Sequence, residues 1–210
     1  MTKFKDKYRV ESARLRGWDY TSAGWYFVTI CTHHRECVFG RVVNGDVELS
    51  PLGEIACQYW IEIPAHTSGI ETDVFTIMPN HMHGIVVIPE RPGPVETQHA
   101  ASLPSDPMSA ILPKAGSLSA VVRSYKSAVT RWAGLNGYDS FAWQARFHDH
   151  IIRDEPELNR IRRYIHDTAK HAGALVRADG DEIPTRRGII PAVQPGRFNA
   201  IFVLEFRHDS

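Results

Sequence analysis

The segment Met78-Pro79-Asn80-His81-Met82-His83, followed by the apolar run from Gly84 to Ile88, constrains the fold more than any other feature. Pro79-Asn80 separates two segments rich in β-branched and apolar residues, 72–78 and 81–88. This pattern predicts two strands, the second being either the antiparallel neighbour of the first or its continuation. Residues two apart on a strand project to the same side, so His81 and His83 should share one face of a sheet.

Two imidazoles buried together need hydrogen bonds or a metal, and a divalent-cation site is therefore one hypothesis for His81 and His83. The motif alone is weak. With 11 His in the chain, a His-x-His triplet is expected by accident on the order of 0.5 times. His148-Asp149-His150 is a second such triplet. Hydrogen-bonded polar residues at the start of a strand are the alternative interpretation.

The composition suits one domain of moderate size or one domain with appendages. The chain has 210 residues, 43% of them hydrophobic, which is ample for a packed core. No apolar stretch approaches the ~18 residues of a membrane span, and the first residues lack the apolar core of a signal peptide. We therefore expect a soluble cytoplasmic protein. Cys31, Cys37 and Cys57 show no Cys-x-x-Cys spacing and are expected to be reduced structural thiols.

The formal net charge is zero, but the charges are unevenly distributed. Residues 46–96 are almost wholly acidic where charged, whereas basic residues gather in 3–16 and on two expected helices. The helical basic residues are Arg123, Lys126, Arg131, Arg160, Arg162 and Arg163. They are either solvated helix faces or parts of a phosphate-binding surface, and the sequence leaves both interpretations open.

The remaining pattern predicts an alternation of strands and helices. Residues 25–32 read as a strand, and Asn44-Gly45 predicts a tight hairpin between 38–43 and 46–49. Capping signals open helices at about 51–63, 118–135 and 155–170, with a short strand within 141–152. Residues 89–116 read as a mobile Pro-rich insert, and 174–210 as a tail or arm with a strand at 200–204.

Several motifs in one order carry a resemblance. They are Gly24 to Thr32, Met78 to Gly84, Arg123-Ser124-Tyr125-Lys126-Ser127-Ala128, Trp143-Gln144, Asp149 to Arg153, and Arg163-Tyr164-Ile165. Between about Arg14 and His171 the chain resembles the single-tyrosine HUH transposases and is most similar to their REP-associated branch. The resemblance implies an α+β, ferredoxin-like (RRM-like) antiparallel sheet with helices packed on one face, in a domain spanning 1–173. It also implies a homodimer that acts on single-stranded DNA with hairpins.

The resemblance further implies roles for individual residues. Tyr164 would be the nucleophile that cleaves and rejoins DNA through a 5′-phosphotyrosine intermediate, and His81 and His83 would bind Mg²⁺ or Mn²⁺. Tyr125 is a rival at first sight, but it lies within the apolar face of its own helix. One helical turn after the tyrosine the family has a side-chain amide as a third ligand, and here Thr168 stands instead. A Thr hydroxyl is the poorer ligand, so metal binding is expected to be weak.

Two other function classes stay open from the sequence. A domesticated, non-catalytic hairpin-DNA-binding protein would need the basic residues Arg123, Lys126, Arg131, Arg160 and Arg163, but not Tyr164. An RNA-binding module is disfavoured, because the strands lack an evident pair of exposed stacking aromatics. Trp143 and Gln144 are expected to be structural, although Gln144 could touch a base or a phosphate.

Overall fold

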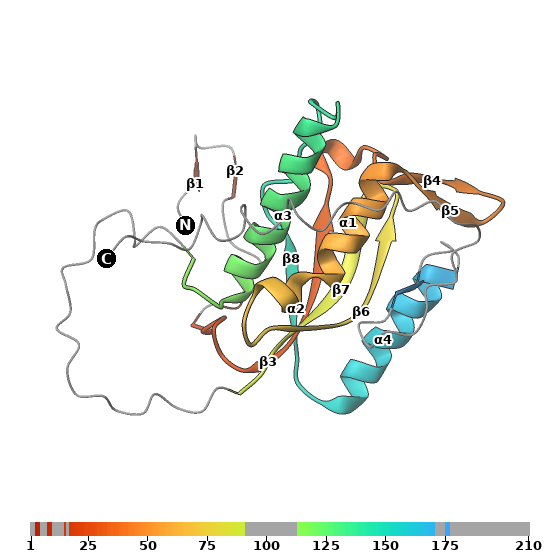
Figure 1. Cartoon of the computed structure of the whole chain (residues 1–210). Coiled ribbons are helices and arrows are strands. Elements are labelled where there is room, and N and C mark those ends of the chain that lie inside the picture. Colours follow the sequence, from red (N-terminus) through yellow and green to blue (C-terminus); the bar gives the residue numbers. More distant parts are fainter. Residues whose placement is uncertain are drawn as a thin grey trace. The chain divides into compact units, whose positions relative to one another are not determined.

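The protein is described by a computed structural model that covers residues 3–4, 8–9, 15, 17–90, 113–170 and 175–176. Its centre is an antiparallel sheet with the strand order β8-β3-β7-β6-β9 (Figure 1). The strands of this sheet are β3 (Gly24–Cys31), β6 (Glu71–Met78), β7 (His81–Ile88), β8 (His148–Ile152) and β9 (Leu175–Val176). Two smaller antiparallel pairs are β1 (Lys3–Phe4) with β2 (Tyr8–Arg9), and β4 (Gly40–Val43) with β5 (Asp46–Leu49).

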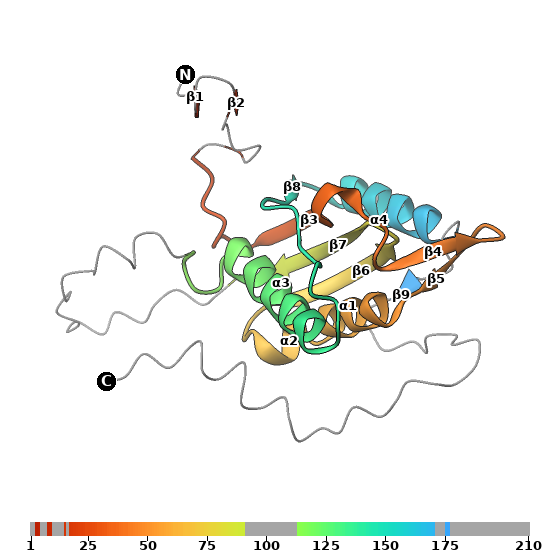
Figure 2. The same cartoon turned by 90° about the horizontal axis from the view of Figure 1, so that it is seen from above.

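The helices lie on both faces of the sheet. They are α1 (Pro51–Ile61), α2 (Ile63–His66), α3 (Leu118–Leu135) and α4 (Glu155–Lys170), and a short 3₁₀ turn covers His33–Arg35. Ser50 and Ser117 cap α1 and α3, since their hydroxyls accept hydrogen bonds from the N–H groups of Gly53 and Ala120. Figure 2 shows α1 and α3 on one side of the sheet and α4 on the other.

The face beneath α1 and α3 holds the larger core. The β3 side chains Tyr26, Val28 and Ile30 alternate into it and are fully buried. The indole ring of Trp60 in α1 lies against Gly84 of β7 and meets the ring of Tyr125 in α3 edge to face. Aromatic side chains thus fill the space between this face of the sheet and its two helices.

The opposite face of the sheet is covered by α4. Its core consists of Val74, Ile85, Ile152, Leu158 and Ile165. Leu158 and Ile165 are seven residues apart, so they lie on the same side of α4 and turn it toward the sheet. The guanidinium of Arg162 adds an ion pair with Asp73 of β6, at an N–O distance of 2.6 Å. The amphipathic stripe of α4 therefore decides which of its side chains can reach the sheet.

The expected fold class and most expected elements are confirmed. The α+β fold with an antiparallel sheet is present, and the strands, the hairpin at Asn44-Gly45 and the three long helices lie near their expected bounds. One detail differs from the expectation of helices on one face, because the apolar stripe of α4 covers the second face.

Two other expectations need a correction or a note on coverage. The strand expected within 141–152 is shorter, since only His148–Ile152 pairs continuously with β3, and Trp143 makes an isolated bridge to Thr32. Most of the expected insert at 89–116 and of the tail at 174–210, including the strand at 200–204, lies outside the described residues. Within the described ranges, no helix is both long and apolar enough to cross a membrane.

Candidate active site

Two histidines and one tyrosine meet on the face of the sheet that α4 covers. His81 and His83 project from β7 with ring centroids 4.8 Å apart, as their spacing predicts. Tyr164 projects from α4, and its hydroxyl oxygen lies 3.3 Å from Nε2 of His83. The ring of Phe27 stacks on the His83 ring and meets the Tyr164 ring edge to face. The fold therefore brings together three residues that the sequence marked, from two separate elements.

The orientation of each imidazole is set through Nδ1. Asn80 donates from its amide nitrogen to the carbonyl oxygen of Arg35, so its Oδ1 faces His81 at 2.7 Å and accepts a hydrogen bond from the Nδ1–H of His81. Nδ1 of His83 lies 2.9 Å from the hydroxyl oxygen of Thr29, the residue directly opposite on β3. In both rings Nε2 is the nitrogen that faces away from these contacts.

Electrostatics keep both histidines neutral. Burial, together with the smaller effects of the neighbouring His81 and His148, lowers the pKa of His83 from its ordinary value of 6.5 to about 4. Burial also lowers the pKa of His81, and the nearby Arg35 guanidinium acts in the same direction. At neutral pH both rings are therefore uncharged, which is the state in which an imidazole nitrogen can bind a metal.

The two candidate tyrosines differ sharply in their surroundings. Tyr164 is 51% exposed, with its hydroxyl at the histidines. Tyr125 is 2% exposed, and its hydroxyl donates to the carbonyl oxygen of Ala56 inside the core. Burial raises the pKa of Tyr125 well above its ordinary value, which disfavours the nucleophilic phenolate. These environments favour Tyr164 over Tyr125 as a reacting group.

Thr168 follows Tyr164 by one helical turn, as the sequence requires, but its hydroxyl is engaged within α4. Its Oγ1 donates to the carbonyl oxygen of Tyr164 at 2.8 Å. This back-bond aims the hydroxyl proton along the helix, and only an oxygen lone pair is left for a ligand. A role for Thr168 in metal binding stays a prediction.

The residues of the site fit a divalent metal as an incomplete donor set. Two neutral imidazoles, each held through Nδ1, can offer their Nε2 atoms to one ion. No cluster of three or more His, Cys, Asp or Glu suited to a metal occurs among the described residues. The other positions around an ion at His81 and His83 would therefore fall to water, to the Thr168 hydroxyl or to a substrate oxygen.

The predicted DNA-binding residues divide between the two sides of the sheet. Arg123 and Arg131 are exposed on α3, and Arg160 and Arg163 are exposed on α4. The helices α3 and α4 that carry the two pairs lie on opposite sides of the sheet (Figure 2). The ammonium of Lys126 donates to the carbonyl oxygen of Gln144 at 2.7 Å, and burial lowers its pKa. Contacts of all five with DNA stay predictions.

Trp143 has the structural role that the sequence suggested. Its side chain is 9% exposed, and its Nε1 donates to the carbonyl oxygen of Lys126. The backbone N–H of Gln144 donates to the carbonyl oxygen of Cys31 at the end of β3. These bonds fasten the segment before β8 to the sheet, while the Gln144 residue itself is exposed.

Sequence reasoning missed the partners that orient the site. Thr29 and Asn80 hold the two imidazoles, and neither was singled out. Asn80 precedes the first histidine directly, so its proximity was readable from the sequence. Thr29 depends on the register between β3 and β7, which places it opposite His83, and the sequence did not specify that register.

The chain is similar to proteins of known structure and to a curated protein. No family model matches the chain. Among solved structures, a REP-associated tyrosine transposase bound to a REP hairpin superposes with a TM-score of 0.49 and 19% identity, covering 78% of this chain and 76% of that one. A candidate transposase from Deinococcus radiodurans gives a TM-score of 0.35 and 16% identity, covering 75% of this chain and 98% of that one.

Among curated proteins, an uncharacterized protein from Haemophilus influenzae is 38% identical to this chain over 157 residues. The match covers 73% of this chain and 84% of the relative. The chain belongs to the same protein family as this Haemophilus influenzae protein.

Proposed function

We propose that the protein is a metal-dependent transposase that cleaves and rejoins single-stranded DNA, with Tyr164 as its nucleophile. The observation that carries the proposal is the contact between the Tyr164 hydroxyl, on a half-exposed side chain, and the neutral His83 ring. A tyrosine beside a histidine pair is an arrangement suited to attack on a phosphodiester. The resemblance in the sequence motifs points to the same chemistry.

In the proposed reaction the Tyr164 oxygen attacks the phosphorus of a DNA phosphodiester and loses its proton. The bond from phosphorus to the 3′ oxygen breaks, and the departing strand leaves as a free 3′-hydroxyl after taking up a proton. The product is a 5′-phosphotyrosine, which keeps the energy of the broken bond. A free 3′-hydroxyl can therefore reverse the step and join strands without ATP.

His83 is better suited to bind a metal than to remove a proton. With a pKa of about 4 it is a weak base at neutral pH, although its Nε2 lies within reach of the tyrosine hydroxyl. His81 and His83 would hold Mg²⁺ or Mn²⁺ through Nε2. A bound divalent ion would polarise the scissile phosphate and offset charge that develops on the leaving oxygen. The nitrogen ligands favour Mn²⁺ over Mg²⁺.

The proposed partner is single-stranded DNA that folds into hairpins, and the proposed assembly is a homodimer. Both follow from the resemblance. Arg160 and Arg163 are the basic residues best located to hold a DNA backbone near Tyr164, since all three share α4. Arg123 and Arg131 on α3 would contact a different part of the DNA. In this reading the protein acts in DNA transposition or recombination.

A non-catalytic hairpin-binding protein is the second candidate, and one observation favours it. The Thr168 hydroxyl is turned to its own helix, so the third ligand of the metal site is weak. A protein that only binds hairpins would keep the sheet and the basic residues without a competent metal site. The two candidates make the same prediction for binding and opposite predictions for cleavage.

A single experiment separates the candidates. The protein is incubated with labelled single-stranded hairpin DNA from the flanks of its own gene, with Mn²⁺ or Mg²⁺, and covalent adducts are resolved on a denaturing gel. We expect an adduct with the native protein and with Tyr125→Phe, and none with Tyr164→Phe, which should still bind. An undiminished adduct in Tyr164→Phe would remove the nucleophile assignment. DNA that is bound but uncleaved with either metal would support the second candidate.

A further inference from the structure

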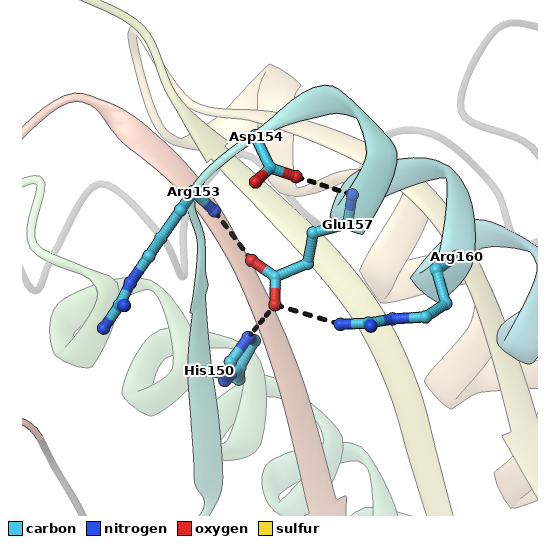
Figure 3. Close-up of polar contacts among 5 residues, drawn as sticks. All are labelled: His150, Arg153, Asp154, Glu157 and Arg160. Atoms are coloured by element: carbon cyan, nitrogen blue, oxygen red, sulfur yellow. Dashed lines mark hydrogen bonds and ion pairs between the residues drawn. The ribbon is translucent and has the colours of Figure 1, made fainter.

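The first turn of α4 is tied to β8 by a cluster of polar contacts around one carboxylate (Figure 3). Oε1 of Glu157 accepts from Nε2 of His150 at 2.9 Å and from the guanidinium of Arg160 at 3.2 Å. Oε2 of the same carboxylate accepts from the backbone N–H of Arg153 at 3.0 Å. The backbone N–H of Glu157 in turn donates to Oδ1 of Asp154, which caps the helix. One side chain therefore joins the helix, the turn before it and the strand.

The cluster and the candidate active site share one face of the sheet and one side of α4. Glu157 and Tyr164 are seven residues apart, which is close to two full turns, so both point from the same side of the helix. His150 lies directly opposite Phe27 in the β3–β8 pairing. The Phe27 ring in turn contacts the rings of His83 and Tyr164. A shift of the first turn of α4 relative to β8 would therefore change the position of Tyr164 relative to His83.

A second polar contact, which we also call a tie, joins α4 to β6, on the other side of the β3–β7 pair from β8. The guanidinium of Arg162 binds Asp73 of β6 and lies over the Trp25 ring of β3, 5.3 Å from its centroid. In the strand order β8-β3-β7-β6, the two ties thus reach strands on either side of the β3–β7 pair that carries Thr29 and His83. Contacts with both β8 and β6 restrain the angle at which α4 crosses the sheet more than either contact alone would.

We propose that the His150–Glu157 pair positions Tyr164 by setting the angle at which α4 crosses the sheet, so that the tyrosine hydroxyl stays at Nε2 of His83. Its consequence for cleavage rests on the proposed function, but the positioning itself does not. Glu157 and His150 are positioning residues here, since they act on Tyr164 through α4 and β8 and not by a direct hydrogen bond to Tyr164, His81 or His83. Surface ion pairs contribute little to stability, and the His150 side chain is 46% exposed, so its loss should leave the fold intact.

The test uses variants that separate the tie to β8 from the helix cap. His150→Ala removes the strand partner but leaves the bond from the Arg153 N–H to Glu157. His150→Gln keeps an N–H donor and should restore the tie in part. The control is Glu155→Gln, which removes an exposed acid from the same helical turn without touching the cluster.

The readout independent of cleavage is the ¹⁹F spectrum of protein labelled with 3-fluorotyrosine, in which Tyr164→Phe identifies the resonance of residue 164. We expect that resonance to shift or broaden in His150→Ala, to return toward its native position in His150→Gln, and to stay unchanged in Glu155→Gln. The cleavage readout is the rate of adduct formation at saturating hairpin DNA. This rate should fall about tenfold or more in His150→Ala, because misplacement of a reacting group slows the chemical step. The affinity for the hairpin should stay within about twofold of the native value.

The outcomes distinguish this inference from the proposed function. An unchanged Tyr164 resonance in His150→Ala would overturn the inference, whether or not the native protein cleaves DNA. An equal change of the Tyr164 resonance in Glu155→Gln would also overturn the inference, since the change would then be caused by the lost negative charge in the first turn of α4. Absence of any adduct in the native protein would count against the proposed function alone, because the spectrum still reports the position of Tyr164.

Discussion

The hydroxyl oxygen of Thr29 lies 2.9 Å from Nδ1 of His83, across the pairing of β3 with β7. His83 is 6% exposed, so this contact satisfies a nitrogen that water cannot easily reach. It also fixes the plane of the ring whose Nε2 faces Tyr164. A hydrogen bond to the second nitrogen of a histidine that binds a metal or faces a reacting group sets the orientation and the basicity of that histidine.

Replacing Thr29 by Val should therefore weaken the site while keeping the shape of the side chain. The buried Nδ1 would lose its partner, at a cost of roughly 1–3 kcal/mol, and Mn²⁺ affinity should fall about 10- to 100-fold. Thr29→Ser keeps the hydroxyl and serves as the control. Urea unfolding gives the stability, and a Mn²⁺ titration followed by electron paramagnetic resonance gives the affinity. A Val variant that matches the native protein in both would refute this role.

The depressed pKa of His83 predicts a specific dependence of stability on pH. In the unfolded chain the ring titrates near 6.5, and in the folded protein near 4. Between these values the unfolded state binds a proton that the folded state does not, so lowering the pH favours unfolding. The stability contributed by the neutral buried ring is present above the unfolded pKa and is lost as the pH falls toward about 4.

From neutral pH to about pH 5, this single group should remove roughly 2 kcal/mol from the free energy of unfolding. The measurement is urea unfolding of the native protein and of His83→Gln at both pH values. Other groups titrate in this range too: those remote from His83 act equally in both proteins, whereas His81 and His148, which interact with His83, add a smaller difference. The loss of stability on acidification should therefore be smaller in His83→Gln by about that amount. Equal losses would show that His83 is not held neutral by burial.

Gly84 is required because of what packs against it. A Cβ at this position would lie 2.5 Å from Cζ2 of Trp60, a fully buried ring with no room to move. Gly84→Ala should cost about 1–3 kcal/mol of stability, as overpacking of a core does. Gly134 in α3 is the matched control, since a Cβ there meets nothing within 4 Å. Gly134→Ala should stabilise the protein by up to about 1 kcal/mol, and thermal unfolding of both variants is the check.

The elements of the fold could be predicted because each has a local cause in the sequence. Ser50 and Ser117 do cap their helices, and Asn44-Gly45 does form the hairpin turn, with Asn44 in the left-handed region. The spacing of His81 and His83 put both on one face, as expected. These features depend on a few neighbouring residues, and tertiary packing did not override them.

The features that were missed depend on distant pairs. That α4 covers the second face follows from the packing of Leu158 and Ile165 on Val74 and Ile85, and no local signal tells one face of a sheet from the other. The partners of the site were missed for the same reason, since Thr29 reaches His83 only through strand register. Asp73, the partner of Arg162, lies in β6 where the register shifts, which sequence patterns do not locate.

The proposed role of Thr168 as a third metal ligand gives the last prediction. Thr168 occupies the position where the resembling family has an amide, and its hydroxyl is bonded to the carbonyl oxygen of Tyr164. An Asn side chain carries a carbonyl oxygen one bond further from the backbone and is a better ligand for a divalent ion than a hydroxyl. Thr168→Asn should therefore bind Mn²⁺ more tightly than the native protein, by about tenfold if one ligand is gained, and should raise the rate of adduct formation.

Thr168→Val is the matched control, because it keeps the branched shape and removes the oxygen. If the hydroxyl contributes a ligand, Val should bind Mn²⁺ more weakly than Thr; if it only bonds to the helix, the two should bind equally. Mn²⁺ titrations of the three proteins, with hairpin cleavage measured in parallel, give the order of affinities. Should Asn neither tighten metal binding nor speed cleavage, the account of residue 168 as the third metal ligand is wrong.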